Sequence, residues 1–227
     1  MKKLLILLSL LIFGANAQAA ITLNLLPTKE QRAYVTKVGY TLLNANRIPY
    51  KITFSTKTSK ALNAVTYYTN NEIVVTTSLL ETVAKEDELA AILAHEISHS
   101  VDYRQGVFKG YFSYLGTSLA PRKYEYKADK RAVDYLVKAG YNPLALIVSL
   151  NLIAPQDRYE WCATHPLTTR RMAEVYEYIY NKYPQYLVQN EYKDNLIYQN
   201  FLLTSKENRA KLEQKVKSNS KRKVNYL

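Results

Sequence analysis

The stretch ILAHEISHSVDY, residues 92–103, places two histidines four positions apart with a glutamate between them. At about 100° per residue on a helix, His95 and His99 lie about 40° apart and share one face. The chain has three histidines in all, and two of them stand here. The stretch is therefore either a metal-binding catalytic helix or an ordinary helix that carries two hydrogen-bonded histidines.

The surroundings of this pair favour a metal. Leu93 and Ile97 lie opposite the histidines on the helix, which predicts a buried helix. Buried imidazole and carboxylate groups cost free energy unless a partner satisfies them. Two imidazoles at positions i and i+4 can bind one zinc ion, and a glutamate beside them can take a proton from water. The pattern therefore predicts zinc ligands at His95 and His99 and a general base at Glu96.

A third ligand is predicted on a second helix. The stretch RKYEYKAD, residues 122–129, carries Glu125 and Asp129 four positions apart and hence on one face. Glu125 would complete a site of two histidines and one glutamate, with one position left for water. Asp129 would accept a hydrogen bond from a ligand histidine and fix its tautomer. The alternative is a solvated acidic pair among the neighbouring lysines.

The remaining sequence predicts an α+β domain in which helices dominate a small sheet. Three runs rich in β-forming residues, at 50–55, 63–68 and 72–77, predict the strands, and residues 69–71 predict a hairpin turn. The hydrophobic spacing and capping signals predict helices at residues 27–48, 78–84, 85–102, 121–139, 144–154 and from 170 onward.

Residues 1–19 have the composition of a secretory signal peptide. Two lysines precede an apolar run at residues 4–13, and small residues with the spacing of a cleavage site follow. We expect a periplasmic or secreted protein with no transmembrane helix after signal cleavage. The predicted division is a signal peptide at 1–19, a metallopeptidase domain at 20–204 and a basic tail at 205–227.

The charge and the single cysteine leave two questions open. The net charge is +12, and its excess is concentrated in residues 206–223. No nucleic-acid motif accompanies it, so the tail is predicted as a solvated helix or as a peripheral contact with anionic lipid or envelope polymer. Cys162 is predicted as a buried thiol, with a soft ligand near the site as the alternative.

Four segments together resemble the HtpX-like and CAAX-prenyl-endopeptidase family of zinc metallopeptidases, within the gluzincins. DELAAILAHEISHSVD resembles the active helix of the family, and EYKADKRAVDYLVKAGYNP resembles its glutamate–aspartate helix. NEIVVTTSLLE resembles the strand and turn before the active helix, and THPLTTRRM resembles the later His-Pro segment. The resemblance covers residues 62–175 in the family's order.

The resemblance implies one zinc ion per chain, held by His95, His99 and Glu125. It also implies that Glu96 is the general base and that Asp129 supports the ligands from behind.

Further roles rest on the resemblance alone. His165 falls on the His-Pro histidine of the family, which would stabilise an oxyanion or cap the metal in a latent state. Arg171 falls on the arginine six residues later and would have a structural role. Residues 72–77 would form the edge strand that receives an extended peptide. The chain departs from the family in a short spacer before Glu125 and in two asparagines, residues 70 and 71, in place of a glycine pair.

The leading functional hypothesis is a soluble periplasmic zinc endopeptidase that hydrolyses unfolded or misassembled envelope proteins. One alternative is a latent, zinc-stabilised periplasmic chaperone or adaptor with little proteolysis. Another is a secreted metalloprotease that acts on peptidoglycan-linked or host proteins, with the basic tail as a targeting element. All three take protein or peptide partners and none takes nucleic acid.

Overall fold

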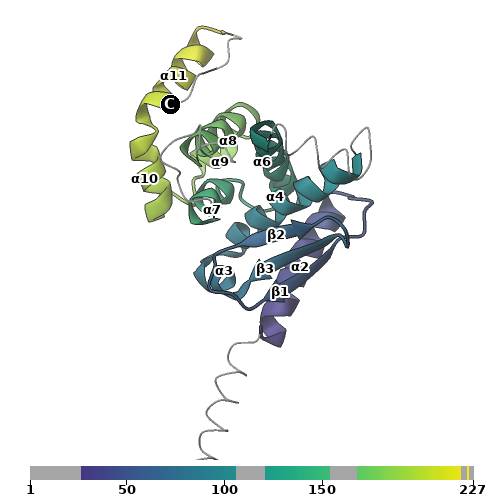
Figure 1. Ribbon diagram of the computed structural model, residues 1–227. Helices are drawn as coiled ribbons and strands as arrows, with labels where there is room; N and C mark the ends of the chain where they lie inside the picture. Colours follow the sequence, from purple (N-terminus) through teal and green to yellow (C-terminus); the bar gives the residue numbers. More distant parts are fainter. Residues whose placement is uncertain (1–26, 106–120, 154–167, 221–223, 225–227) are drawn as a thin grey trace, which may run out of the picture.

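The computed structural model describes residues 27–105, 121–153, 168–220 and 224, and helices dominate them (Figure 1). The predicted signal peptide, His165 and Cys162 lie outside these ranges. In chain order the elements are α2 (Lys29–Ala45), β1 (Thr53–Lys57), β2 (Ala64–Tyr67), β3 (Glu72–Thr76), α3 (Thr77–Thr82), α4 (Glu86–Gln105), α6 (Pro121–Lys138), α7 (Ala145–Ile153), α8 (Thr168–Lys182), α9 (Gln185–Val188), α10 (Leu196–Thr204) and α11 (Lys206–Lys217). The predicted α+β class is confirmed.

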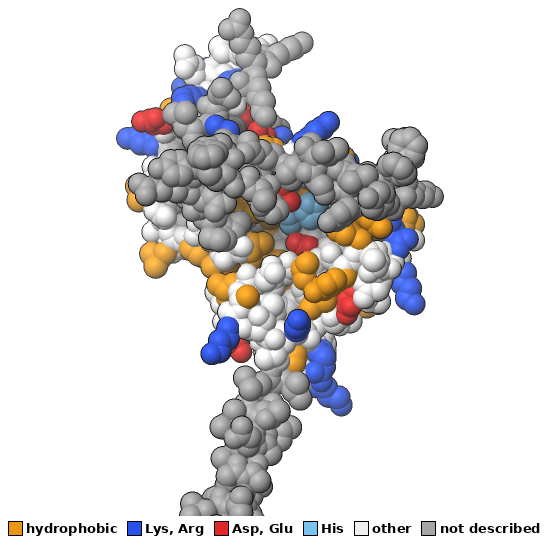
Figure 2. All heavy atoms as spheres, viewed as in Figure 1, with side chains coloured by type: hydrophobic (Ala, Val, Ile, Leu, Met, Phe, Trp, Pro, Cys, Tyr) orange, Lys and Arg blue, Asp and Glu red, His pale blue; other side chains and the backbone are white. Residues whose placement is uncertain are grey.

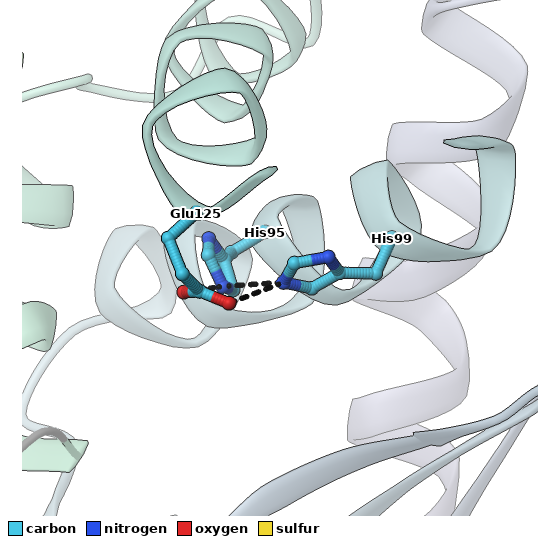
Figure 3. Close-up of side chains that lie close together, drawn as sticks. All are labelled: His95, His99 and Glu125. Atoms are coloured by element: carbon cyan, nitrogen blue, oxygen red, sulfur yellow. Dashed lines mark hydrogen bonds and ion pairs between the residues drawn. The ribbon is translucent and has the colours of Figure 1, made fainter. Parts of the chain in front are cut away.

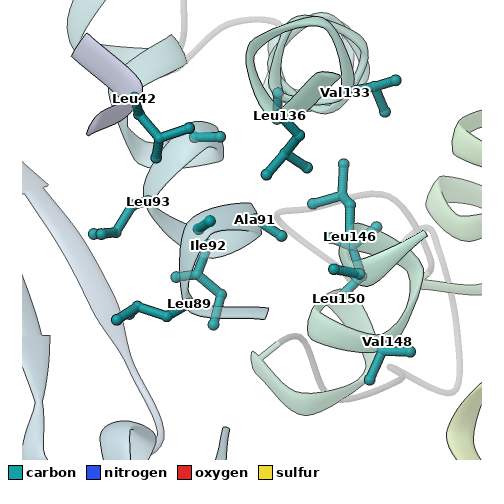
Figure 4. Close-up of a cluster of buried hydrophobic side chains, with 14 of the residues drawn as sticks. Leu42, Leu89, Ala91, Ile92, Leu93, Val133, Leu136, Leu146, Val148 and Leu150 are labelled. Carbon is teal, nitrogen blue, oxygen red and sulfur yellow. The ribbon is translucent and has the colours of Figure 1, made fainter. Parts of the chain in front are cut away.

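Helix α4, which carries the two neighbouring histidines, is the central element of the fold. It runs between the sheet and the helices α6 and α7, and α8 packs on those two helices (Figure 1). Leu42 of α2 lies on one side of α4, while Leu136 of α6 and Leu146 of α7 lie on another (Figure 4). The apolar side chains of α4 are buried along most of its length, because it has neighbours on several sides.

The sheet has the order β1-β3-β2, with β1 parallel to β3 and β2 antiparallel to it. The prediction that residues 72–77 form the edge strand is therefore wrong, because β3 lies in the centre. Ile73, Val74 and Val75 form a continuous apolar run in which every side chain is buried, as expected for a strand with a neighbour on each side. The edge strand that contacts α4 is β2.

The turn between β2 and β3 confirms the predicted hairpin, in which asparagines stand in place of the glycine pair of the family. Asn71 adopts a left-handed backbone with a φ of 55°, which asparagine tolerates better than most residues. Its side-chain oxygen accepts a hydrogen bond of 2.9 Å from Nε of Arg104, near the end of α4. The hairpin is therefore attached to the central helix at its turn.

Part of the predicted basic tail is helical. Leu212 of α11 is buried, and Lys215 Nζ forms an ion pair of 2.6 Å with Glu177 of α8. Beyond the helix, Val224 packs against Ala173. Two statements about the tail stay predictions. One is the domain boundary at residue 205, and the other is a contact of the tail with an envelope surface. Within the described ranges, no helix combines the length and the apolarity needed to cross a bilayer.

The packing of α6 on α4 predicts a large cost for a cavity between them. Leu136 is fully buried there, so Leu136→Ala is expected to lower the free energy of unfolding by about 2–5 kcal/mol. Leu203→Ala on α10 is the matched control, since 77% of Leu203 is exposed. Urea denaturation of both variants measures the difference, and equal stability would contradict this account of the core.

Candidate active site

Three side chains from two helices converge on one point. His95 and His99 come from α4, and Glu125 comes from the first turns of α6 (Figure 3). The two Nε2 atoms lie 3.0 Å apart, and each lies 3.4 Å from an oxygen of Glu125. His95 and Glu125 are buried, which excludes a solvated position for Glu125. The structure thus brings together the three predicted ligands.

The spacing of these atoms fits a metal ion. Ligand atoms about 2.0–2.1 Å from a tetrahedral zinc ion are separated from one another by about 3.3 Å. The observed separations of 3.0–3.4 Å are close to this value. Two imidazole nitrogens and one carboxylate oxygen are also the donor types that zinc prefers. The site can therefore hold a metal ion without rearrangement of the three side chains.

Asp129 and Arg171 support the ligands from behind. Asp129 Oδ1 lies 3.0 Å from His95 Nδ1 on the side away from His99. Arg171, from α8, donates two hydrogen bonds of 2.8 and 2.7 Å to the oxygens of Asp129. Its Nη1 also lies 3.1 Å from Glu125 Oε2. One buried guanidinium therefore contacts both the predicted ligand Glu125 and the carboxylate of Asp129 beside His95.

The electrostatics of the site favour a cation at the convergence point. Burial alone would lower the pKa of His95, but hydrogen bonds to Asp129 and Glu125 outweigh it and raise that pKa to about 10. Burial alone would raise the pKa of Asp129, but the charge and hydrogen bonds of Arg171, together with the contact with His95, outweigh it and hold that pKa below its usual range. The Asp129 carboxylate therefore stays ionised, and the acidic side chains around His95 attract positive charge, whether a proton or a metal ion.

The carboxylate of Glu96 is hydrogen-bonded to the sheet. Thr66 Oγ1, on β2, donates a hydrogen bond of 2.6 Å to Glu96 Oε2 and also lies 3.1 Å from the backbone oxygen of Glu96. The sequence analysis missed Thr66, because one threonine in a short strand carries no signal of its partner 30 residues later. This contact orients the predicted base and attaches β2 to α4.

A second contact that the sequence analysis missed joins α4 to α6 beyond His99. Asp102 Oδ1 lies 2.8 Å from Arg131 Nη1 and 2.7 Å from Lys127 Nζ. Arg131 also donates to the backbone oxygen of Ser98 at 3.1 Å. These contacts hold α6 against the histidine helix and so help to place Glu125. The basic residues of α6 entered the sequence analysis only as neighbours of a solvated acidic pair, which was the alternative to the metal site.

The geometry can now be compared with known proteins. Residues 29–105 and 107–179 match the family described as Peptidase family M48. The chain belongs to this family. The match confirms the resemblance to a metallopeptidase family, and it includes every side chain of the site described above. The M48 peptidases depend on a metal ion, which agrees with the His95, His99 and Glu125 group.

A curated M48 relative is the "Beta-barrel assembly-enhancing protease" of Yersinia pestis. It is 26% identical over 183 residues, which cover 63% of this chain and 37% of the relative. The chain thus matches well under half the length of that relative.

The double contact of Arg171 predicts that its loss will be costly. Arg171→Ala leaves two buried carboxylates without their cation, so we expect about 3–5 kcal/mol of lost stability. Lys182→Ala is the control, because its ion pair with Asp134 is at the surface and should contribute about 0–1 kcal/mol. Urea denaturation in the presence of a chelator measures both without a contribution from metal. Similar losses for the two variants would contradict the proposed importance of Arg171.

Proposed function

We propose that the chain is a zinc-dependent endopeptidase in which His95, His99 and Glu125 hold one zinc ion and Glu96 is the general base. The observation that carries this proposal is the arrangement of Glu96. It follows His95 directly on α4, and its carboxylate is held by Thr66 rather than by the ligand group. A carboxylate in this place is free to exchange a proton next to the metal ligands.

The side chains of the site would divide the reaction as follows. When bound, zinc would polarise the scissile carbonyl and acidify a water molecule. Glu96 accepts a proton from the attacking water and then gives it to the leaving amine. Thr66 holds the carboxylate of Glu96 in place during both transfers. Asp129 keeps the proton of His95 on Nδ1, so that Nε2 presents a lone pair.

Arg171 would keep the group of carboxylates from repelling one another. Its contacts with Asp129 and Glu125 neutralise part of their charge without occupying the ligand positions. We assign it a positioning role and no contact with substrate.

The substrate would lie as an extended strand along β2. Thr76 N donates to Asn63 O at 3.0 Å, so this pair and every second pair after it bond β2 to β3. By the same alternation, the backbone groups of Ala64 and Thr66 point away from β3. In the part of the chain that the structure describes, no strand pairs with that edge. A peptide could add there as a further strand, beside Glu96.

We further propose that the substrates are unfolded or misassembled proteins of the cell envelope. The signal-like composition of residues 1–19 supports a periplasmic or secreted location. The name of the Yersinia pestis relative, which refers to β-barrel assembly, supports an envelope substrate. The alternative of a latent chaperone or adaptor has less support, because a protein that does not cleave would need neither Glu96 nor its hydrogen bond to Thr66.

Glu96→Gln tests the proposal directly. The substitution keeps the size of the side chain but removes the base, so cleavage of an unfolded protein substrate should fall by about 10²–10⁴-fold. Zinc content should stay the same, because Glu96 is not a proposed ligand. Glu81→Gln, on the exposed surface of α3, is the matched control. Full activity of Glu96→Gln would reject the mechanism, and zinc bound to an inactive wild type would favour the chaperone or adaptor.

Metal analysis tests the ligand set. The purified chain should contain one zinc ion, and a chelator should remove both the metal and the cleavage of the protein substrate. His99→Ala should lower zinc content strongly, while Lys182→Ala should not change it. Elemental analysis by mass spectrometry gives the stoichiometry. Cleavage that persists in the fully metal-free protein would contradict a metal-dependent reaction.

A further inference from the structure

We propose that Val65 and Tyr67, on the outer face of β2, select substrate segments in which every second residue is apolar. This inference rests on the proposed function, since it assumes that the peptide pairs with β2. It narrows the substrate class to chain segments with the pattern of an amphipathic β-strand that has not found its own sheet.

The first observation is the burial pattern along β2. Thr66 is buried on the face toward α4, where it meets Glu96. Successive side chains of a strand point to opposite faces, so Val65 and Tyr67 share the other face. They are 37% and 45% exposed, although each has a cross-strand neighbour on β3. Figure 2 shows hydrophobic side chains on the surface near exposed histidine atoms and acidic side chains.

The second observation is the composition of the edge. Exposed edge strands usually carry charge or proline, which prevents other chains from pairing with them. The strand β2 has the sequence AVTY and carries neither. Leu62, just before the strand, is also 40% exposed. A single exposed apolar side chain needs no explanation, but an unprotected edge beside a catalytic base is suited to receive another strand.

The third observation concerns the distance at which side chains would meet. Val65 and Tyr67 direct their backbone groups toward β3, by the alternation that starts at Asn63. An antiparallel peptide on the free edge would therefore meet them in pairs without hydrogen bonds, where opposite Cα atoms are about 4.5 Å apart. Side chains in such pairs are in close contact, and pairs of aromatic and β-branched residues are favourable.

These positions define a pattern on the substrate. The two residues opposite Val65 and Tyr67 are two positions apart and lie on the outer face. The residue between them, opposite Thr66, faces α4 and the proposed metal ligands. Selection at the two outer positions is thus selection for apolar residues in alternation, whereas a segment with clustered apolar residues can satisfy only one position at a time.

Two peptides of identical composition test this inference. One alternates apolar and polar residues, and the other arranges the same residues in adjacent apolar and adjacent polar pairs. We expect kcat/KM of the wild type to favour the alternating peptide by about 3–10-fold. The double variant Val65→Thr, Tyr67→Thr should reduce this ratio to about one, because threonine keeps the strand but removes most of the apolar contact.

Two further measurements keep the test decisive. Val188→Thr makes the same valine-to-threonine change on α9, which packs on α8. This control should leave the ratio of kcat/KM for the two peptides at its wild-type value. Binding of both peptides to the Glu96→Gln chain, followed by fluorescence anisotropy, gives the same ratio without cleavage. The single variant Tyr67→Thr should fall between the wild type and the double variant.

The outcomes separate this inference from the proposed function. If both peptides are cut with dependence on Glu96 but at equal rates, the selection by β2 is refuted and the endopeptidase stands. The same holds if the preference survives in the double variant. If neither peptide is cut, the proposed function fails. The affinities of the two peptides can then still be compared, first for the wild type and then for the double variant. A preference for the alternating peptide that is lost in the double variant would show that β2 selects alternating segments.

Discussion

The buried guanidinium of Arg171 is the contact on which the site depends. It reaches from α8 to two carboxylates of α6, and one of these orients His95 on α4. Three helices are joined by it at the point where the ligands converge. Without this cation, the buried carboxylates would repel one another or would become protonated. The positive charge of Arg171 stabilises the ionised form of Asp129, which in turn orients His95.

The fold places this cluster at the junction of its two parts. Helix α4 contacts the sheet on one side and α6 and α7 on the other. Its metal-facing residues therefore meet Glu125 from the helical part, whereas Glu96 meets Thr66 from the sheet. His95 and the proposed base Glu96 are consecutive on one helix, yet they contact different layers of the fold. This division explains how neighbouring residues can have separate chemical environments.

The elements of this site differ in how well the sequence predicts them. Helical periodicity predicts that His95 and His99 share one face of α4 and that Glu125 and Asp129 share one face of α6. The need of a zinc site for a third ligand then predicts that the two faces meet. The place of β3 was predicted wrongly, although its continuous apolar run indicates a central strand. Thr66 and the contact of Asp102 with Arg131 could not be predicted, because each joins elements far apart in the sequence. The roles of His165 and Cys162 stay predictions, since both residues lie outside the described ranges.

The hairpin of β2 and β3 is attached to α4 at two places, through Thr66 and through Asn71. These two contacts therefore hold the proposed docking edge and the proposed base together, and a substrate would not have to order them. The conformational cost of binding then falls on the substrate, whose segment must become extended and leave any sheet of its own. For a folded protein this cost includes local unfolding, so its own stability would protect it. Discrimination between folded and unfolded proteins would thus follow from the shape of the edge, with no separate sensor.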